Sequence, residues 1–492
     1  MSVKLSASAL ARLPREISRP NYGRSDLRAG IVHFGVGNFH RAHQAVYLDD
    51  LFIAGSDRDW AIVGAGVRDA DIPVREKLGD QDWLTTVVEQ EADSTRPRVI
   101  GSMIDFVKPG DVAAALALLD RPEIRIVSLT ITEGGYYISP ATQAFDAANP
   151  DILADARHID APKTVFGLIV AALMRRRAAG VAPFTVMSCD NIPGNGHVTE
   201  NAVAGLANLI DPGLASWIRQ SVAFPNSMVD RITPATTDRE RALLHDGFGL
   251  DDNWPVFCEE FRQWVLEDKF PAGRPALEKV GVTFTSDVAP YELMKIRILN
   301  GGHATIAYPA ALLDIHFVHE AMANSLVRDF LEKLTREEII PTVPPPPGTD
   351  LEQYRDLIAR RFANPKIGDT ISRLCFDGSN RQPKFILPTV MDRLKKGRAI
   401  KGLALVSALW CRYCYGETES GQTIAPNDPS WGRLRAAAKL AKDAPQKFLE
   451  MRDIFGELSQ DRAYIAAFSG ALSQLWARGV RSTLEDYLSG SP

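Results

Sequence analysis

A short apolar run that ends in two closely spaced glycines constrains the fold of this chain more than any other feature. The run Gly30–Phe34 reads GIVHF and leads directly into Gly35-Val36-Gly37. It predicts a buried strand with a tight turn at Gly35, followed by a position at Gly37 where a phosphate can approach the backbone. The next segment, Phe39–Leu51, is predicted to be a helix whose N-terminus faces that phosphate. His40 replaces the third glycine of the usual pattern, so a purely structural turn explains these residues alone about as well.

The second predicted strand carries acidic residues at its end. Ala61–Val67 reads AIVGAGV and is followed by Arg68-Asp69-Ala70-Asp71. An acid at this place in a dinucleotide-binding fold accepts hydrogen bonds from the ribose of NAD and repels a 2′-phosphate. Asp69 and Asp71 therefore favour NAD, whereas Arg68 leaves NADP use open, and a solvated turn is the alternative. The expected cofactor-binding residues are Gly35, Val36, Gly37, Asn38, Phe39, Arg68, Asp69 and Asp71.

Polar residues also follow two later strands. Ile124–Thr132 has the composition of a buried parallel strand, and Pro183–Ser188 is a further strand. Ligands of doubly wound sheets bind at the carboxyl ends of the strands, so Asn191 is a candidate donor to a reacting oxygen or to the cofactor. Asp230 could bind sugar hydroxyls, or it could pair with the neighbouring Arg231 in a purely structural contact.

The second half of the chain has a different pattern. After a strand-like segment at Lys279–Phe284 the apolar spacing becomes mainly helical, and we place a domain boundary near Ser286. The chain is therefore predicted to be α/β, with a Rossmann-type domain over 1–285 and a mainly α-helical domain over 286–492. The expected helices are Tyr291–Leu313, Val318–Leu334, Leu351–Phe362, Ile386–Lys396, Ala399–Tyr415, Trp431–Leu440 and Pro445–Phe455.

The first of these helices contains the pattern K-x4-N-x2-H, formed by Lys295, Asn300 and His303. At about 100° per residue, Asn300 would lie roughly 140° round an α-helix from Lys295, with His303 between them. Apolar surroundings lower the pKa of a lysine, which could then take a proton from an alcohol, while the amide donates to the resulting oxygen anion. Glu292, one turn earlier, could relay that proton or be a surface carboxylate. Taken alone, the three residues also fit a structural helix with a snorkelling lysine.

A polar segment with three cations lies between two of the later helices. Arg373 precedes it, and Asp377–Phe385 contains Arg381 and Lys384. We expect a loop here. It could close over a substrate, or it could be an ordinary solvated loop.

Composition excludes several classes of function. The 492 residues are 45% apolar and 24% charged, with a net charge of −5, as in ordinary globular proteins. No basic block indicates nucleic acid, no segment is long enough to span a membrane, and the N-terminus lacks a secretion signal. Five cysteines argue against a disulfide scaffold and for a reducing, cytoplasmic location. Cys411 and Cys414 are expected on one helical face, and the histidines and cysteines form no convincing metal site.

Taken together, these segments give the chain a clear resemblance to a known family. It resembles the long-chain mannitol dehydrogenases, which are zinc-independent and specific for polyols, from about Gly30 to the C-terminal helices. Each fragment alone is weak, but the set is specific. The matching segments are HFGVGNFHRAHQA, SLTITEGGY, TVMSCDNIPGNG, FPNSMVDRITP, WVLEDKF, KIRILNGGH and SNRQPKF.

The resemblance implies an NAD-dependent, reversible oxidation of D-mannitol to D-fructose by an enzyme that is often a monomer, with the site between its two domains. The acidic pair for the adenosine ribose falls at Ala70 and Asp71, which makes strict NAD use less secure. An arginine at position 381 replaces an expected lysine, so sugar selectivity could differ. The implied roles are Lys295 as general base, Asn191 and Asn300 as oxyanion donors, His303 as the positioning residue, and Asp230, Arg373 and Arg381 as substrate-binding groups.

Three other interpretations remain open at this stage. A fructuronate or tagaturonate reductase of the same family would pair Arg373 and Arg381 with a carboxylate, although Asp230 would oppose it. A zinc alcohol dehydrogenase would need ligands that the sequence does not offer. A dinucleotide-binding regulator without catalysis is disfavoured by the complete K-x4-N-x2-H set.

Overall fold

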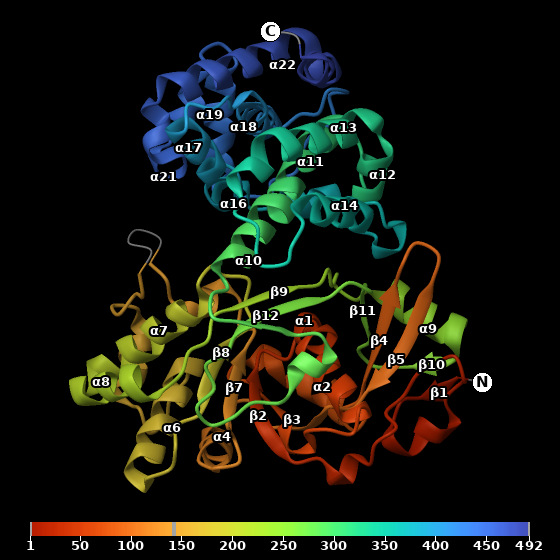
Figure 1. The fold of residues 1–492 in the computed structure, drawn as a ribbon, viewed down its shortest axis with the longest axis vertical. Helices are drawn as coiled ribbons and strands as arrows, with labels where there is room; N and C mark the ends of the chain where they lie inside the picture. Colours follow the sequence, from red (N-terminus) through yellow and green to blue (C-terminus); the bar gives the residue numbers. More distant parts are fainter. Residues whose placement is uncertain (1, 140–143, 491–492) are drawn as a thin grey trace. The chain divides into compact units, whose positions relative to one another are not determined.

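The computed structural model describes residues 2–139 and 144–490. The chain divides into two compact units, Met1–Ala289 and Pro290–Pro492, here called unit 1 and unit 2. Unit 1 combines strands and helices, and unit 2 is built of helices (Figure 1). The predicted fold class, a Rossmann-type domain followed by a mainly helical domain, is confirmed.

A five-stranded parallel sheet organises unit 1. Its order is β6-β3-β2-β7-β8, so the chain builds outward from β2 in one direction and then reverses to add β7 and β8. In such sheets the reversal opens a crevice at the carboxyl ends of the two central strands, here β2 and β7. The strands are β2 (Ala29–Phe34), β3 (Ala61–Ala65), β6 (Met103–Phe106), β7 (Ile126–Leu129) and β8 (Thr185–Ser188).

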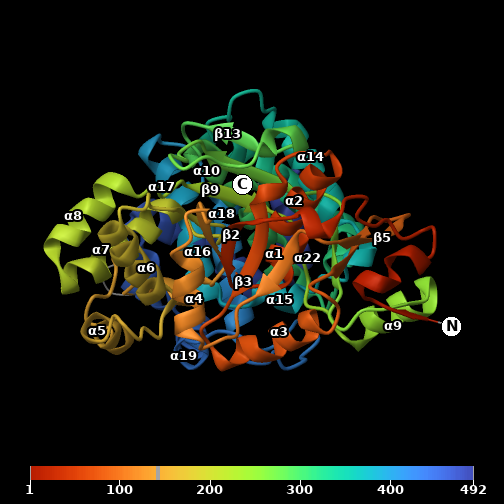
Figure 2. The same ribbon diagram turned by 90° about the horizontal axis from the view of Figure 1, so that it is seen from below.

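Apolar side chains hold helices against this sheet. All residues of β3, β7 and β8 are buried, as expected for parallel strands that are covered on both faces. Figures 1 and 2 show α6, α7 and α8 together at one end of the unit and β5 with α9 at the other. The helices are α1 (Asn38–Ala42), α2 (Gln44–Ile53), α3 (Ile72–Gly79), α4 (Val112–Leu119), α5 (Pro150–Arg157), α6 (Val165–Ala179), α7 (Asn195–Ile210), α8 (Pro212–Ser221) and α9 (Asp238–Phe248).

In the described part of unit 1, three small sheets accompany the parallel sheet, and of their strands the sequence predicted only a segment that overlaps β13. Their strand orders are β11-β4-β5, β13-β12-β9 and β1-β10. The predicted strand at Lys279–Phe284 is wrong in its first part, because Leu277–Val280 forms a 3-10 helix and the strand covers only Thr283–Thr285. The strands are β1 (Val3–Lys4), β4 (Thr85–Gln90), β5 (Thr95–Ile100), β9 (Ser227–Asp230), β10 (Leu250–Asp251), β11 (Val256–Glu259), β12 (Gln263–Glu267) and β13 (Thr283–Thr285).

The predicted helix at Phe39–Leu51 is two helices with a break at His43. The backbone there has φ −120° and ψ −90°, which is outside the helical region. The His43 ring is buried, contacts Trp264 at a centroid distance of 5.4 Å and bonds the Gln263 carbonyl at 2.9 Å. This contact with β12 favours the break in the helix at His43. Because its partner lies 220 residues further along the chain, local spacing could not predict it.

Unit 2 packs its helices around one large apolar core that includes most of α18. Cys411 and Cys414 lie buried on α18, which confirms their expected helical placement, and all five cysteines are free. The helices are α10 (Ala289–Met294), α11 (Gly301–Leu312), α12 (Val318–Ala323), α13 (Ser325–Leu334), α14 (Leu351–Phe362), α15 (Ile371–Cys375), α16 (Gly378–Phe385), α17 (Leu387–Lys395), α18 (Lys401–Cys414), α19 (Trp431–Ala441), α20 (Gln446–Leu449), α21 (Arg452–Phe455) and α22 (Arg462–Ser489).

Several local predictions in unit 2 are wrong in detail. The expected loop at Asp377–Phe385 is the helix α16, because the Ser379 amide and hydroxyl both bond Asp428 at 2.8 Å and fix its first turn. The expected helix at Val318–Leu334 is interrupted at Asn324, whose side chain caps α13. The expected helix at Pro445–Phe455 is two short helices, α20 and α21.

Candidate functional site

The turn after β2 has the geometry that the sequence predicts. Gly35 has φ +93°, and a Cβ there would lie 2.1 Å from the Thr130 carbonyl oxygen at the end of β7. The Gly35 carbonyl accepts from the Gly37 amide and from the Thr130 hydroxyl, both at 2.7 Å. His40, in place of the third glycine, stacks on His33 at 3.5 Å between ring centroids. Burial lowers the pKa of both rings, which are therefore neutral and can pack at the base of the turn.

A cavity of about 310 Å³ in unit 1 opens beside this turn. Three of the predicted cofactor residues, Gly35, Arg68 and Asp71, line it. Gly37 adds open space, since a Cβ there would meet nothing closer than 3.8 Å. The cavity therefore fits the phosphate-containing part of a dinucleotide, which needs close approach to the backbone at such a turn. Its other lining residues are Phe34, Gly66, Val67, Ile131, Gly135, Tyr137, Asp151, Lys163, Thr164 and Val165.

The two acids after β3 have different surroundings. The Asp71 carboxylate accepts from the backbone amides of Val67 at 3.1 Å and Arg68 at 3.0 Å, and it lies 3.6 Å from the Arg68 guanidinium. Asp71 thus shapes the turn itself. Asp69 is exposed on the same turn, whereas Asp71 is among the residues that line the cavity.

Arg41 braces the start of α1, although the sequence did not single it out. Its guanidinium donates to the Gly37 carbonyl at 3.3 Å and to the Asn38 side chain at 2.7 Å, and it lies 3.8 Å from the centre of the Trp254 ring. The side chain is fully buried. Asn38 in turn donates to the Pro234 carbonyl at 3.3 Å. The predicted cofactor residues Gly37 and Asn38 therefore belong to a cross-linked framework.

Asn191 is exposed on a well-braced loop beyond β8. The preceding residue, Asp190, accepts from the amides of Ile131 and Thr132 at 2.9 Å, which ties the ends of β7 and β8 together. Asn195 donates to the Asp190 carbonyl at 3.0 Å on the other side. Thr132 has φ +65°, a strained value for a β-branched residue and a frequent mark of functional loops. No sequence signal would have shown this strain.

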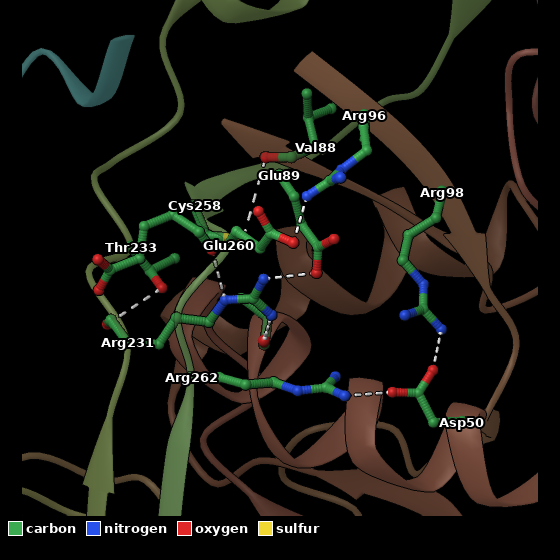
Figure 3. A network of polar contacts seen from close by, with 12 residues as sticks. Asp50, Val88, Glu89, Arg96, Arg98, Arg231, Thr233, Cys258, Glu260 and Arg262 are labelled. Carbon is green, nitrogen blue, oxygen red and sulfur yellow. Dashed lines mark hydrogen bonds and ion pairs between the residues drawn. The ribbon is translucent and has the colours of Figure 1, made fainter. Parts of the chain in front are cut away.

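Asp230 is buried at the end of β9. The next residue, Arg231, belongs to an extended network of polar contacts (Figure 3). Arg231 pairs with Glu89 at 2.6 Å and donates to the carbonyls of Ala42 at 2.5 Å and Glu259 at 2.9 Å. The identified partner of the Arg231 charge is thus Glu89, on β4. Arg231 links the end of β9 to the break between α1 and α2. Figure 3 also shows the Arg98–Asp50–Arg262 and Arg96–Glu260 ion pairs of the same network.

In unit 2, Lys295 and Asn300 lie at the two ends of a π-helical turn, Lys295–Asn300, between α10 and α11. Both residues are buried, with exposed fractions of 7% and 8%. The expectation of α-helical spacing is wrong here. Hydrogen bonds in a π turn run from residue i to i+5 instead of i+4. The wider turn therefore brings Asn300 towards the same helical side as Lys295 instead of 140° away.

His303 follows on the first turn of α11. Its ring stacks on Phe362 of α14 at 4.2 Å, and its Nε2 is buried without a hydrogen-bond partner among the residues that the structure describes. Burial, reinforced by the positive charges of Arg373, Arg361, Arg381 and Lys295, holds the pKa of His303 well below its usual value. A neutral imidazole has one donor and one acceptor nitrogen, which suits it to hold a hydroxyl.

Two of the arginines whose charges act on His303 already have partners within unit 2. Arg373, on α15, forms a two-pronged ion pair with Asp369, with Nε 2.5 Å from the carboxylate. Arg381, on α16, donates to the carbonyls of Arg373 at 3.2 Å and Leu374 at 3.0 Å. The sequence did not indicate the buried Arg361 as a site residue, because it lies near the end of an ordinary amphipathic helix, α14.

The described residues offer neither a metal-binding cluster nor a membrane-spanning helix. Over 2–139 and 144–490, no cluster of three or more histidine, cysteine, aspartate or glutamate side chains is arranged to hold a metal ion. Within the same ranges, no helix has both the length and the apolar character needed to cross a bilayer.

The strand order, the glycine turn at the sheet reversal and the cavity beside it define a dinucleotide-binding protein of the doubly wound α/β class. Residues 29–279 match the family profile described as the mannitol dehydrogenase Rossmann domain, and residues 287–476 match the mannitol dehydrogenase C-terminal domain. The chain belongs to the mannitol dehydrogenase family, and it is an oxidoreductase. The predicted family resemblance is thereby confirmed.

Relatives in this family are similar over their full length. A mannitol 2-dehydrogenase of Cereibacter sphaeroides is 58% identical over 478 residues, which cover 97% of this chain and 100% of that protein. The structure of Pseudomonas fluorescens mannitol 2-dehydrogenase, a ternary complex with NAD and D-mannitol, has a TM-score of 0.90 at 45% identity and full coverage of both chains. A substrate-free D-sorbitol dehydrogenase has a TM-score of 0.91 at 38% identity, with coverage of 98% of this chain and 100% of that one.

Proposed function

We propose that this protein oxidises D-mannitol to D-fructose reversibly with NAD, and that Lys295 is the general base. The observation that carries the proposal is a buried lysine amine at one end of a π turn whose other end is a buried amide, Asn300. The relatives support the substrate, because one of them is a complex with NAD and D-mannitol. The neutral His303 nearby supports it further, since a neutral ring suits an uncharged polyol.

The proposed chemistry needs one proton transfer and one hydride transfer. Lys295 takes the proton of the C2 hydroxyl while the C2 hydride leaves, and the carbonyl forms as the C–H bond breaks. NAD, when bound, accepts that hydride. Asn300 donates to the oxygen as negative charge develops, and Asn191 is proposed as the second donor. In the reverse direction protonated Lys295 returns the proton.

The remaining groups are proposed to hold the polyol. Buried Nε2 of His303 lacks a partner in the described chain and can bond a substrate hydroxyl. Asp230, Arg373 and Arg381 supply further polar groups. Glu292 remains the proposed proton relay, with a plain surface carboxylate as the alternative.

For the cofactor, we propose that Gly35, Val36, Gly37, Asn38 and Phe39 receive the pyrophosphate, and that Asp69 accepts from the adenosine ribose. The open space at Gly37 and the cavity lined by Gly35 support this arrangement. Asp71 acts on the turn and not on the ribose in this proposal, because two backbone amides already use its carboxylate. Arg68 lines the same cavity, so NADP use stays open.

We also propose that the protein works as a monomer in the cytoplasm. Five buried, free cysteines suit a reducing compartment.

Replacement of Lys295 by alanine tests the central assignment. We expect kcat for mannitol oxidation to fall by about 10²- to 10⁴-fold, the usual contribution of general base catalysis, while the Kd for NADH is unchanged. The wild-type pH profile should show one ionisation on its acid side that belongs to Lys295. His303 does not produce a limb near neutral pH, because its lowered pKa leaves it neutral there.

The matched control is Lys333→Ala, which removes a lysine on α13 that pairs with Glu337 at 2.8 Å and should leave turnover intact. A Lys295→Ala enzyme that keeps most of its turnover would refute the base assignment.

The uronate reductase alternative is weakened by the ion pair between Arg373 and Asp369, because that arginine already has a carboxylate partner. NADH oxidation with fructose and fructuronate in parallel separates the two activities. A strong preference for the acid would overturn the polyol assignment, and tight NADH binding without turnover of either would indicate a regulator.

A further inference from the structure

Arg297 is a long side chain of the π turn that fastens the turn to other elements of unit 2. Arg297 is the third residue of the turn and is 6% exposed. Its guanidinium donates to the Thr342 carbonyl at 2.8 Å and forms an ion pair with Asp392 of α17. We propose that Arg297 is a positioning residue that keeps Lys295–Asn300 in the π conformation, so that the proposed base and the proposed amide donor share one helical side. This inference rests on the proposed function.

The spacing explains why the conformation matters. Residues five apart in an α-helix lie about 140° from each other, on nearly opposite sides. If the segment relaxed to α-helix, Lys295 and Asn300 could not both address one oxygen atom. The π turn removes that conflict, and short π turns of this kind are frequent at functional sites.

The helix after the turn cannot rotate to compensate, because α11 is closely packed. A Cβ at Gly301 would lie 3.4 Å from the Phe385 carbonyl oxygen, and one at Gly302 would lie 3.4 Å from both Leu331 and Phe362. These van der Waals contacts, together with the burial of nearly every residue of α11, oppose rotation of α11 about its axis. The extra residue between α10 and α11 is therefore expected to stay in the π turn, to which Arg297 contributes an anchored side chain.

The anchor itself sits on rigid structure. Thr342 ends a 3-10 segment that follows the second π turn, Thr335–Ile339, and its hydroxyl donates to the Ile339 carbonyl at 2.7 Å. Asp392 lies on α17, a separate helix of the same unit. The two ends of one planar guanidinium reach two different elements. These contacts therefore fix the orientation of the Arg297 side chain as well as its distance from both elements.

The test compares Arg297→Met and Arg297→Lys with wild type. We expect Arg297→Met to lower kcat for mannitol oxidation by about 10- to 100-fold, as small misplacements of catalytic groups do, without changing the Kd for NADH. The acid limb of kcat/KM should move to higher pH, since a displaced Lys295 gains solvation and binds its proton more tightly. Arg297→Lys keeps a positive charge for Asp392 but loses the forked guanidinium. Its kcat should therefore lie between those of Arg297→Met and the wild type.

Arg412→Met is the matched control. Arg412 is a buried arginine on α18 that donates to the Glu417 carbonyl at 2.8 Å and lies over the Trp476 ring, and neither of these contacts involves the π turn. It should lower Tm by an amount similar to that of Arg297→Met, yet leave kcat and the pH profile unchanged. An Arg297→Met enzyme that behaves like this control would overturn the inference.

The experiments distinguish failure of the proposed function from failure of the positioning role of Arg297. If Lys295→Ala keeps turnover, the proposed function fails whatever Arg297 does. If Arg297→Met does not fold, Asp392→Asn removes the ion pair from its more exposed side and should move kcat and the acid limb in the same direction, by a smaller amount. An unchanged acid limb in Asp392→Asn would then reject the positioning role.

Discussion

The two glycines of the turn after β2 should respond to alanine in different ways. Gly35→Ala forces a side chain into φ +93°, with its Cβ 2.1 Å from the Thr130 carbonyl oxygen. Gly37→Ala meets nothing closer than 3.8 Å, and Gly37 has φ −104°, which alanine adopts readily. The first change therefore acts on the fold, and the second acts on the space that we assign to the pyrophosphate.

The size of each effect follows from these contacts. At Gly35 the left-handed backbone costs about 1–2 kcal/mol, and displacement of the β7 end adds about 1–3 kcal/mol, so the free energy of unfolding should drop by about 2–5 kcal/mol. At Gly37 stability should change by less than about 0.5 kcal/mol. A Cβ in the phosphate path should instead weaken NADH binding by about 1–3 kcal/mol, roughly 5- to 150-fold.

Urea unfolding of the apo protein and fluorescence titration with NADH measure the two quantities separately. The reasoning would be refuted by a Gly37→Ala protein that binds NADH as tightly as wild type, because the phosphate would then lie elsewhere. It would equally be refuted by a Gly35→Ala protein of wild-type stability, since the clash with Thr130 leaves no room for a silent substitution.

Two other predictions concern unit 1. Asp71→Asn should cost about 1 kcal/mol of stability, because a turn carboxylate loses its charge-assisted bonds, whereas Asp69→Asn should keep stability and raise the NADP-to-NAD ratio of kcat/KM. Thermal unfolding and steady-state rates with both cofactors check this pair, and the reverse assignment would be indicated if Asp71→Asn alone changed cofactor choice. Glu89→Gln should cost about 3 kcal/mol in urea unfolding, because it leaves the buried Arg231 without its carboxylate partner. A loss below about 0.5 kcal/mol would show that backbone carbonyls alone satisfy that arginine.

The sequence by itself determined the features that depend on local pattern. Apolar runs followed by glycines or acids located β2, β3 and β8 and the Rossmann-type class, because buried parallel strands have a composition that little else shares. The helix at Leu351–Phe362 was predicted with its observed bounds, since an aspartate caps it and its apolar spacing is regular.

Tertiary contacts decided the rest. The break at His43 exists because its ring bonds a carbonyl 220 residues away, and the helix at Gly378–Phe385 begins where it does because Asp428 caps it. The proposed division of roles between Asp69 and Asp71 rests on the two backbone amides that the Asp71 carboxylate reaches. Above all, the π turn that brings Asn300 towards the side of Lys295 is held by packing of α11 and by the anchors of Arg297, and no local spacing rule contains those contacts.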